Sequence, residues 1–469
     1  MKILLIDPYL SSRDEYGNLS DLSNVIPSLG LAYVAASLKQ NGFDVKVVDC
    51  SVEGISTSQL VNVVRTEAPD VVGFTATVMS IQSALSSLKA IKEHFPGMYA
   101  ILGGPQVTAL PHETMESSEF DAAVIGEGEI TTVELLKRIQ QGSKDMSGIP
   151  GILFRKANKL EFTGSRAHIQ DLSALPKPAF ELFPPFSKYQ YSAISTLKYP
   201  CAHMITSRGC PFSCRFCNKS VTGSAFRSRR PAEVMEEIVA LVEKYGVKEI
   251  KFFDDTFTYQ KENVYEFCDL LDKSKLNMTW SCVAHAACVD RDLLRRMKRS
   301  GCWQIVFGME SGNQGILDAM CKPLTLSQSR QAAKLACEAG MNVRATFIFG
   351  LPGETLSTLQ DTLNFAKAIQ LDTVSFYVFC PFPGSELFRE LKAKGEILHT
   401  DYLHYQTIVD PRKAKPVFVP QGIAQEDFLR FVEKAYKDYY LRPAYIYSQI
   451  RQIKSFGHAR RFWRCAKAL

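Results

Sequence analysis

Three cysteines lie within eight positions of the chain, in the stretch SRGCPFSCRFCNKS at residues 207–220. Cys210, Cys214 and Cys217 have the spacing Cys-x3-Cys-x2-Cys, and the aromatic Phe216 directly precedes the last of them. Thiolates at this spacing can reach three corners of one iron–sulfur cubane and leave its fourth iron open to another ligand. We therefore expect an iron–sulfur cluster in this loop.

A zinc ion is the alternative occupant, but a closed zinc site needs four ligands. Cys201 and His203 are the candidates for the fourth, and both precede the loop on an apparent strand. The other cysteines of the thirteen are scattered through apolar segments, as is typical of buried thiols. An odd number of cysteines in a long chain favours a reduced cytoplasm over a disulfide framework.

The bulk composition is that of a folded protein with more than one domain. A chain of 469 residues exceeds what one core usually covers, which predicts two or three domains. No run of eighteen apolar residues indicates a membrane span, and the opening MKILLIDPYL reads as a buried strand and not as a signal peptide. A net charge of +6 is too small to indicate nucleic acid. We expect a cytoplasmic protein.

Short β-rich runs alternate with amphipathic helical segments over the first 140 residues. The expected strands are residues 2–7, 44–49, 70–76, 99–104 and 122–126. This alternation predicts a doubly wound, Rossmann-like α/β domain with a parallel sheet. Ligands of such domains bind beyond the carboxyl ends of the strands. The residues that we select at those ends are Pro8, Tyr9, Thr75, Gly103, Gly104, Gly126 and Glu127.

Glycine at a strand end has two readings. It lets a large ligand approach the backbone closely, and it is equally typical of a plain turn. No GxGxxG follows the first strand, which disfavours a dinucleotide as the ligand.

A second alternation begins near residue 200, after a proline-rich stretch with some short strands such as GILFRK. The expected strands are residues 203–207, 247–255, 278–284, 303–310, 342–350 and 373–379. Six successive β/α units predict a partial (β/α)6 barrel with its chemistry at the carboxyl-end rim. The chain then divides into a first domain at 1–145, a linker at 146–199, the barrel at 200–390 and a helical C-terminal region at 391–469.

The cysteine loop at the end of the first barrel strand resembles that of the radical S-adenosylmethionine (SAM) superfamily. The resemblance implies that the three cysteines bind a [4Fe–4S] cluster, that its open iron holds SAM, and that SAM is reductively cleaved to a 5′-deoxyadenosyl radical. It also implies SAM contacts at the loop and at the ends of strands two to five: Phe216, Asp254, Asp255, His285, Glu310, Phe349, Gly350 and Leu351.

Each of these contacts has an expected partner on SAM. Asp254 or Asp255 would accept the amino group, Glu310 the ribose hydroxyls, and residues 349–351 would give backbone and apolar contact to adenine. Relatives often carry an arginine at the end of the third strand, where this chain has His285 as the candidate to contact the SAM carboxylate. A carboxylate at a strand end can also cap the following helix, which is the structural alternative.

The sequence of the first domain indicates one particular group within this superfamily. The stretches PSLGLAYVAASLKQNGFDVKVVD, GGPQVTALPHE and VIGEGE resemble the cobalamin-binding domain of the cobalamin-dependent radical SAM enzymes. The strand-end residues of this domain are then the expected cobalamin contacts. The chain has no Asp-x-His-x-x-Gly to supply a histidine ligand to cobalt, which matches the members of this group.

The resemblance implies a methyltransferase acting at an unactivated carbon of a small molecule or lipid. The alternative within the fold is a non-methylating oxidoreductase or ring-forming enzyme, like the anaerobic magnesium-protoporphyrin monomethyl ester cyclase. A tRNA methylthiotransferase is disfavoured because it needs three N-terminal cysteines, and the first domain holds only Cys50. A non-catalytic corrinoid-binding module would not need the cysteine loop.

The partners implied are an external electron donor, such as flavodoxin or ferredoxin, and no nucleic acid. The basic C-terminal stretch from Arg442 to Lys467 could touch anionic lipid, although a solvated helix face explains it as well.

Overall fold

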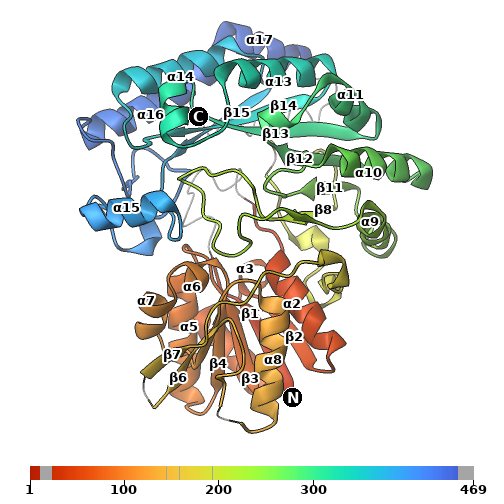
Figure 1. Cartoon of the computed structure of the whole chain (residues 1–469), viewed down its shortest axis with the longest axis vertical. Coiled ribbons are helices and arrows are strands. Elements are labelled where there is room, and N and C mark those ends of the chain that lie inside the picture. The colour runs from red at the N-terminus through yellow and green to blue at the C-terminus, as the bar shows by residue number, and fades with distance from the viewer. Residues whose placement is uncertain (11–23, 144, 158, 193, 453–469) are drawn as a thin grey trace.

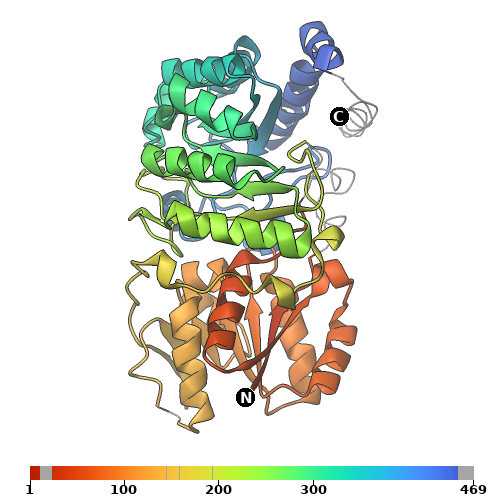
Figure 2. The same cartoon turned by 90° about the vertical axis from the view of Figure 1, so that its right-hand side faces the viewer.

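The computed structural model describes residues 1–10, 24–143, 145–157, 159–192 and 194–452. Two α/β domains are stacked on each other, and the first lies below the second in Figure 1 and in the perpendicular view of Figure 2. Each domain is built around one large sheet.

Seven strands form the sheet of the first domain, in the order β2-β1-β3-β4-β5-β6-β7. They are β1 (Lys2–Asp7), β2 (Asp44–Asp49), β3 (Val71–Thr75), β4 (Tyr99–Gly103), β5 (Ala122–Val124), β6 (Ile152–Lys156) and β7 (Lys159–Phe162). The first five run parallel, whereas β6 and β7 join antiparallel. The five strands expected from the sequence are confirmed, and the stretch expected as a linker begins by extending this sheet.

Helices cover both faces of the first sheet, as a doubly wound fold requires. They are α2 (Leu29–Gln40), α3 (Cys50–Glu53), α4 (Thr57–Glu67), α5 (Ile81–His94), α6 (Pro105–Ala109), α7 (Pro111–Glu116) and α8 (Gly128–Gln140). Alternate residues of β1 serve the two faces: Ile3 and Leu5 pack in the core under α2 and α8, and Leu4 and Ile6 in the core under α4 and α5. Because β1 to β5 run parallel, their carboxyl ends lie at one edge of the sheet, facing the second domain (Figure 1).

Six parallel strands form the second sheet, in the sequential order β15-β14-β13-β12-β11-β8. They are β8 (Cys201–Met204), β11 (Glu249–Phe252), β12 (Thr279–Ala284), β13 (Cys302–Glu310), β14 (Asn342–Phe349) and β15 (Thr373–Val378). A two-stranded ribbon, β9 (Ser207–Arg208) and β10 (Arg227–Ser228), lies at the base of the cysteine loop. Because β8 and β15 are unpaired edges, the predicted partial barrel is confirmed.

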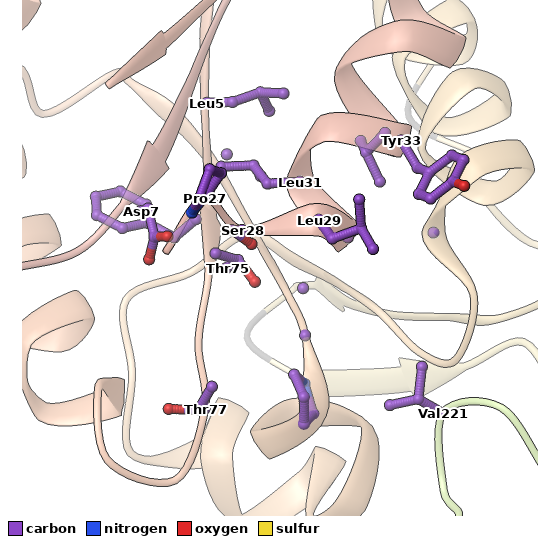
Figure 3. Close-up of a pocket in the computed structure, with 18 of the residues that line it drawn as sticks. Leu5, Asp7, Pro27, Ser28, Leu29, Leu31, Tyr33, Thr75, Thr77 and Val221 are labelled. Atoms are coloured by element: carbon purple, nitrogen blue, oxygen red, sulfur yellow. The ribbon is translucent and has the colours of Figure 1, made fainter. Parts of the chain in front are cut away.

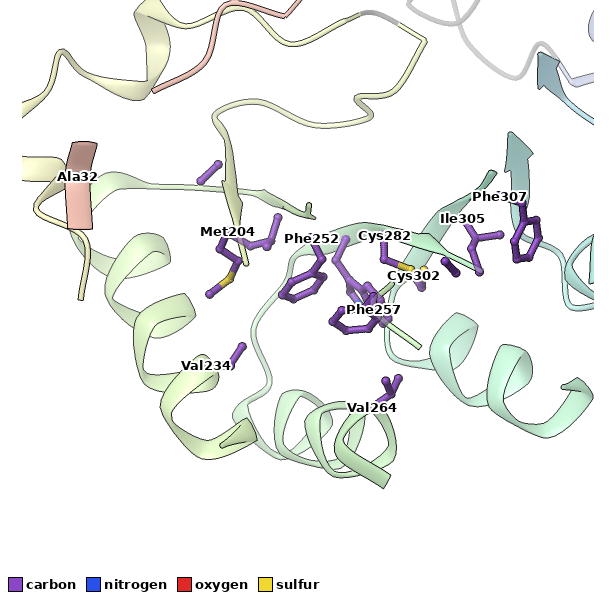
Figure 4. Close-up of a cluster of buried hydrophobic side chains, with 14 of the residues drawn as sticks. Ala32, Met204, Val234, Phe252, Phe257, Val264, Cys282, Cys302, Ile305 and Phe307 are labelled. Carbon is purple, nitrogen blue, oxygen red and sulfur yellow. The ribbon is translucent and has the colours of Figure 1, made fainter. Parts of the chain in front are cut away.

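The outer face of the barrel is covered by helices. They are α9 (Pro231–Tyr245), α10 (Lys261–Ser274), α11 (Arg291–Arg299), α12 (Gln314–Ala319), α13 (Leu326–Glu338), α14 (Leu356–Ala368), α15 (Glu386–Lys394), α16 (Gln425–Tyr440) and α17 (Pro443–Gln452). Figure 4 shows Phe252, Phe257 and Cys282 lying between the strands and the helices α9 and α10. Short 3-10 turns complete the chain at Leu172–Ala174, Phe180–Leu182, Phe186–Lys188, Ala286–Cys288 and Tyr402–His404.

Helix α16 covers the open edge of the barrel at β15. The hydroxyl of Tyr440 accepts from the backbone N–H of Val374 at 3.0 Å. The hydroxyl of Tyr436 accepts from the N–H of Phe376 at 3.2 Å and donates to its carbonyl at 2.7 Å. An exposed strand edge invites pairing with other chains, so these tyrosines protect it. Within the described residues, no helix has the length and apolar character needed to cross a membrane.

Candidate active site

The cysteine loop leaves the carboxyl end of β8 and is fixed at both its base and its middle. Gly209 starts the loop with a φ of +81°, and a Cβ there would lie 2.2 Å from the carbonyl oxygen of Ala225. Glycine is therefore required at this position. In the middle, the N–H of Arg215 donates to the carbonyl of Met320 at 3.0 Å, which holds the loop against the barrel.

The three cysteines are free thiols on one side of this loop, half-buried at Cys210 and Cys214 and exposed at Cys217. Cys214 interacts electrostatically with Cys210, and Cys217 with Cys214, so the thiols share one neighbourhood. The two candidates for a fourth zinc ligand have other partners: Cys201 is buried beside Tyr191, and Nδ1 of His203 is hydrogen-bonded to the Tyr191 hydroxyl at 3.1 Å. Three neighbouring thiols without a fourth ligand fit a cluster with one open iron.

Glu310 ends β13 in a left-handed conformation, with a φ of +63°. A non-glycine residue held there carries backbone strain, and such strain is concentrated at functional sites. Its carboxylate folds back over Gly308, where a Cβ would lie 2.4 Å from Glu310 Oε1. The Lys322 ammonium lies 3.4 Å from the same oxygen and interacts with the thiols of Cys214 and Cys217. Glu310 thus lies beside the cysteine loop, and Lys322 is a rim residue that the sequence analysis missed.

The two aspartates after β11 have different environments. Asp254 is buried and accepts hydrogen bonds from the N–H and hydroxyl of Thr206, at 3.0 and 2.8 Å, and from the hydroxyl of Ser207. These bonds tie the end of β8 to the end of β11. Asp255 is exposed and interacts with Lys219 of the cysteine loop. Asp255 is therefore the carboxylate available to an amino group, and Asp254 has a structural role instead of the expected one.

His285 is buried and stacks on Phe212 of the cysteine loop, with ring centroids 4.2 Å apart. Burial, followed by the charge of Lys322, lowers the pKa of His285 to about 3, so the imidazole is neutral near pH 7. Its Nδ1 accepts from the N–H of Ala287 at 3.3 Å, and its buried Nε2 has no hydrogen-bond partner. Because Nδ1 accepts, Nε2 carries the proton. This position offers a neutral donor and not the cation that an arginine would supply.

The residues that follow β14 offer apolar walls but no free backbone donors. The N–H groups of Gly350 and Leu351 both donate to Glu354 Oε2, at 2.7 and 2.9 Å. The Phe349 ring is buried in the core under α16. The Leu351 side chain belongs to an apolar cluster that Phe216 of the cysteine loop joins. The expected contact to adenine is therefore limited to the apolar side of Leu351 and Phe216.

A cavity of about 660 Å³ lies between the two domains, within the range of sites that bind organic ligands. Six of the seven expected cobalamin contacts line it: Pro8, Thr75, Gly103, Gly104, Gly126 and Glu127. Tyr9 is the exception, with a side chain that is 40% exposed. The second domain contributes His203, Ile205, Arg208, Val221, Thr222 and Phe253. Figure 3 shows Thr75 of the first domain and Val221 of the second among the lining residues.

Asp7 also lines this cavity, at the end of β1 and next to Asp49 at the end of β2. Burial, and then repulsion by Asp49, raises the pKa of Asp7 to about 8. The hydroxyl of Tyr189 donates to Asp49 at 3.0 Å, which favours the charge on Asp49. Of the pair Asp7 and Asp49, Asp7 is then the protonated carboxyl group near pH 7, and it can donate a hydrogen bond to a ligand.

Glu127 joins the two domains. Its carboxylate accepts from Arg208 at 2.8 Å, from Arg227 at 2.9 Å and from the N–H of Ile169 at 2.8 Å. Arg208 also donates to Glu129 at 2.5 Å. The oxygens of Glu127 are therefore occupied, and the residue borders the cavity without a free carboxylate for cobalamin. Because Arg208 stands two residues before Cys210, this network couples the position of the cysteine loop to the first domain.

The two glycines at the end of β4, Gly103 and Gly104, differ in whether the protein itself requires glycine. Gly104 has a φ of +99°, and a Cβ there would lie 2.8 Å from the carbonyl oxygen of Ala76. Glycine is therefore required at position 104 by the surrounding protein backbone. The expected reason, close approach of a ligand, is not the one that the structure shows. At Gly103 the nearest atom to a Cβ is the carbonyl oxygen of Phe74, 3.9 Å away, so a side chain fits the protein there.

We predict that Gly103→Val prevents cobalamin from copurifying while the cluster and the fold remain. The side chain would extend into the cavity, and overpacking of about 1 to 3 kcal/mol weakens a ligand roughly tenfold or more. Cobalamin and iron per chain are measured together. Gly97→Val is the matched control, because Gly97 lies outside the cavity and its Cβ would meet nothing within 4 Å. Undiminished cobalamin in Gly103→Val would place the corrin elsewhere.

We predict that Glu310→Gln weakens SAM binding about tenfold or more. The amide loses a charge-assisted hydrogen bond to the ribose, worth about 1.5 to 3 kcal/mol. Calorimetric titration of the reconstituted protein measures the affinity. Lys322→Gln breaks the same ion pair and measures what its loss costs in melting temperature. If Glu310→Gln binds SAM as tightly as the parent and only melts lower, Glu310 is a structural cap.

The fold places a three-cysteine loop at the carboxyl end of a partial barrel, and residues flanking its cysteines, Arg208, Val221 and Thr222, line the cavity shared with the Rossmann-like domain. Comparison with known families agrees. The model of the Radical SAM superfamily matches residues 204–366, and that of the B12 binding domain matches residues 17–136.

Two curated relatives and one solved structure match over most of the chain. An uncharacterized methyltransferase of Pyrococcus horikoshii is 32% identical over 97% of this chain and 96% of its own. The anaerobic magnesium-protoporphyrin IX monomethyl ester cyclase of Rubrivivax gelatinosus is 29% identical over 95% of this chain and 78% of its own. The radical SAM methyltransferase TsrM of Kitasatospora setae, with cobalamin and a [4Fe–4S] cluster bound, has 16% identity and a TM-score of 0.68, over 92% of this chain and 84% of its own.

The chain therefore belongs to the cobalamin-dependent radical SAM enzymes. This confirms the family, the fold class, the enzyme class and the three cofactors expected from the sequence: a [4Fe–4S] cluster, SAM and cobalamin.

Proposed function

We propose that this enzyme transfers a methyl group to an unactivated carbon of a small-molecule or lipid substrate. The main support for this proposal is the ion pair between Arg208 and Glu127, which connects the two domains. Arg208 lines the cavity of the first domain, binds Glu127, and stands two residues before Cys210. The residues suited to cobalamin and those suited to the cluster are thus linked by a buried ion pair, which fits a reaction that uses both cofactors.

The cofactors supply the chemistry: when bound, the cluster provides the electron that cleaves SAM to a radical, and cobalamin provides the methyl group. The residues of the chain bind these cofactors and orient them. Cys210, Cys214 and Cys217 are suited to hold the cluster, Asp255 and Glu310 to accept hydrogen bonds from SAM. Phe216, within the apolar cluster of Leu351, helps to exclude water from the place where a radical forms.

The cyclase relative supports a second candidate, a non-methylating oxidation or ring closure. Product mass distinguishes the two reactions with the reconstituted enzyme and candidate substrates. Methyl transfer adds one methylene to the substrate, whereas cyclisation or desaturation removes hydrogen or adds oxygen. A product that has only lost hydrogen would reject the proposal in favour of the second candidate.

An electron donor of the flavodoxin or ferredoxin type fits this chemistry, and its identity is part of the proposal. The contact with anionic lipid rests on the stretch from Arg442 to Lys467, of which residues 453–467 lie outside the described residues. That contact stays a prediction.

A further inference from the structure

The strands of the second domain present two different faces. Ile250 of β11, Val343 of β14 and Phe376 of β15 pack under the helices, as does Cys282, which Figure 4 draws against α10. Because side chains alternate along a strand, the residues between them face the lumen of the barrel. These lumen residues include Lys251, Ser281, Gln304, Val306, Arg344, Thr346, Ser375 and Tyr377.

The amino-end floor of the lumen is closed by one buried carboxylate. Glu249 accepts from the N–H groups of Leu197 and Lys198, at 2.8 and 2.7 Å. It also accepts from the indole N–H of Trp303 at 3.1 Å and the hydroxyl of Thr279 at 3.3 Å. Glu249 is therefore satisfied by neutral donors, and the chain at 197–198 forms the base of the lumen.

Two cations stand just above this floor. Lys251 has a side chain that is 3% exposed, and its ammonium lies 3.6 Å from the nearest oxygen of Glu249, beyond hydrogen-bonding distance. Arg344 donates to the hydroxyl of Ser375 at 2.8 Å, and its buried Nε has no hydrogen-bond partner. Lys251 and Arg344 repel each other, which contributes to lowering the pKa of Lys251 after burial.

This arrangement sets two cations, Lys251 and Arg344, against the single carboxylate of Glu249. Glu249 is shared between one lysine and several neutral donors, and within the described part of the chain Arg344 bonds a hydroxyl and pairs with no carboxylate. Buried cations are costly unless they are paired. His203, the register partner of Lys251, adds no negative charge; it lines the cavity between the domains, whereas Lys251 and Arg344 are not among the residues that line it.

The lumen side of β14 also remains open to solvent. Along this strand the helix-facing residues are fully buried, while Arg344, Thr346 and Ile348 are half-buried. Tyr377 on β15 is half-buried in the same way. A ligand entering from the rim could therefore reach the guanidinium of Arg344.

We propose that Lys251 and Arg344 bind an oxyanion, a phosphate or carboxylate, carried by the substrate. The assignment of this ligand as the substrate rests on the proposed function. The planar guanidinium suits two oxygens of such a group, and the ammonium adds a compact charge.

The position of Arg344 also limits the length of the substrate. Arg344 lies four residues before Ile348, which packs against the same apolar cluster as Phe216 of the cysteine loop. Four residues of a strand span about 13 Å. The substrate should therefore separate its reacting carbon from its oxyanion by roughly 10 Å. A substrate that is much shorter could not occupy both places.

Binding of inorganic phosphate and of acetate to the reconstituted enzyme tests the proposal. Calorimetric titration should show that at least one of them binds, and Arg344→Gln should weaken it roughly tenfold or more. Arg412→Gln is the control, since Arg412 is an exposed arginine that pairs with Asp410, and it should bind as the parent does. Binding of phosphate alone points to a phosphorylated substrate, and binding of acetate to a carboxylate.

If Arg344→Gln does not fold stably, Arg344→Lys is a second variant on which anion binding can be measured. The lysine preserves the positive charge but not the planar set of N–H donors of the guanidinium. This variant should bind the anion with an affinity between those of the parent and Arg344→Gln. Failure of both anions to bind the parent, or equal binding by the parent and either lumen variant, overturns the proposal. Methyl transfer to substrate is measured separately, so loss of anion binding and absence of methyl transfer are distinguishable results.

Discussion

Replacing Cys210, Cys214 and Cys217 together with alanine should leave a folded protein that binds no cluster. The thiols lie in a loop and outside the core clusters, so their removal costs little packing. A cluster held by three thiolates has no remaining protein ligand once all three are gone. The iron content after anaerobic reconstitution should fall from about four per chain to near zero, and SAM cleavage should cease.

A second variant shows whether loss of iron is specific. Cys321 and Cys337 are exposed and half-buried thiols outside the loop, and their joint replacement with alanine should leave the iron content unchanged. Retention of about four irons by the triple variant would contradict the assignment of the loop.

Glu127→Gln should destabilise the protein more than any exposed charge change. Glu127 and Arg227 each have side chains that are 4% exposed, and Arg227 pairs with no other carboxylate of the described residues. Removing one partner of a buried pair leaves an uncompensated charge, at a cost of about 3 to 5 kcal/mol. Urea unfolding measures the loss.

Glu134→Gln is the matched control for this change. Glu134 pairs with Arg166 in the same domain, but its side chain is 42% exposed. A pair of this kind contributes about 0 to 1 kcal/mol. If the two variants lose the same stability, Glu127 does not hold the domains together as we describe.

The strands could be predicted from the sequence because their apolar runs are bounded by polar ends. The loop at Cys210 was equally visible, since its chemistry depends on spacing alone. The sequence also indicated β6, within GILFRK, but it did not indicate β7 or show that the two strands join the first sheet antiparallel. Local pattern does not reveal which sheet edge such strands join.

The partners of buried charges could not be predicted. Asp254 and Asp255 are neighbours of one type, and only the fold shows that the first is saturated by Thr206 while the second is exposed. The same holds for Glu127, whose guanidinium partners are far along the chain. Alternation places Lys251 on the lumen face, but local sequence does not show that Arg344, on a strand three places further along the sheet, faces the same lumen.

The co-products of turnover with methyl-labelled SAM test the central claim most directly. Hydrogen abstraction leaves 5′-deoxyadenosine, and restoring the methyl donor leaves S-adenosylhomocysteine, so methyl transfer should yield both in about equal amounts, with label in the substrate. The reconstituted enzyme with its substrate should give this result, and the triple cysteine variant should give no deoxyadenosine. Substrate turnover with deoxyadenosine, no S-adenosylhomocysteine and no label in the product would contradict methyl transfer.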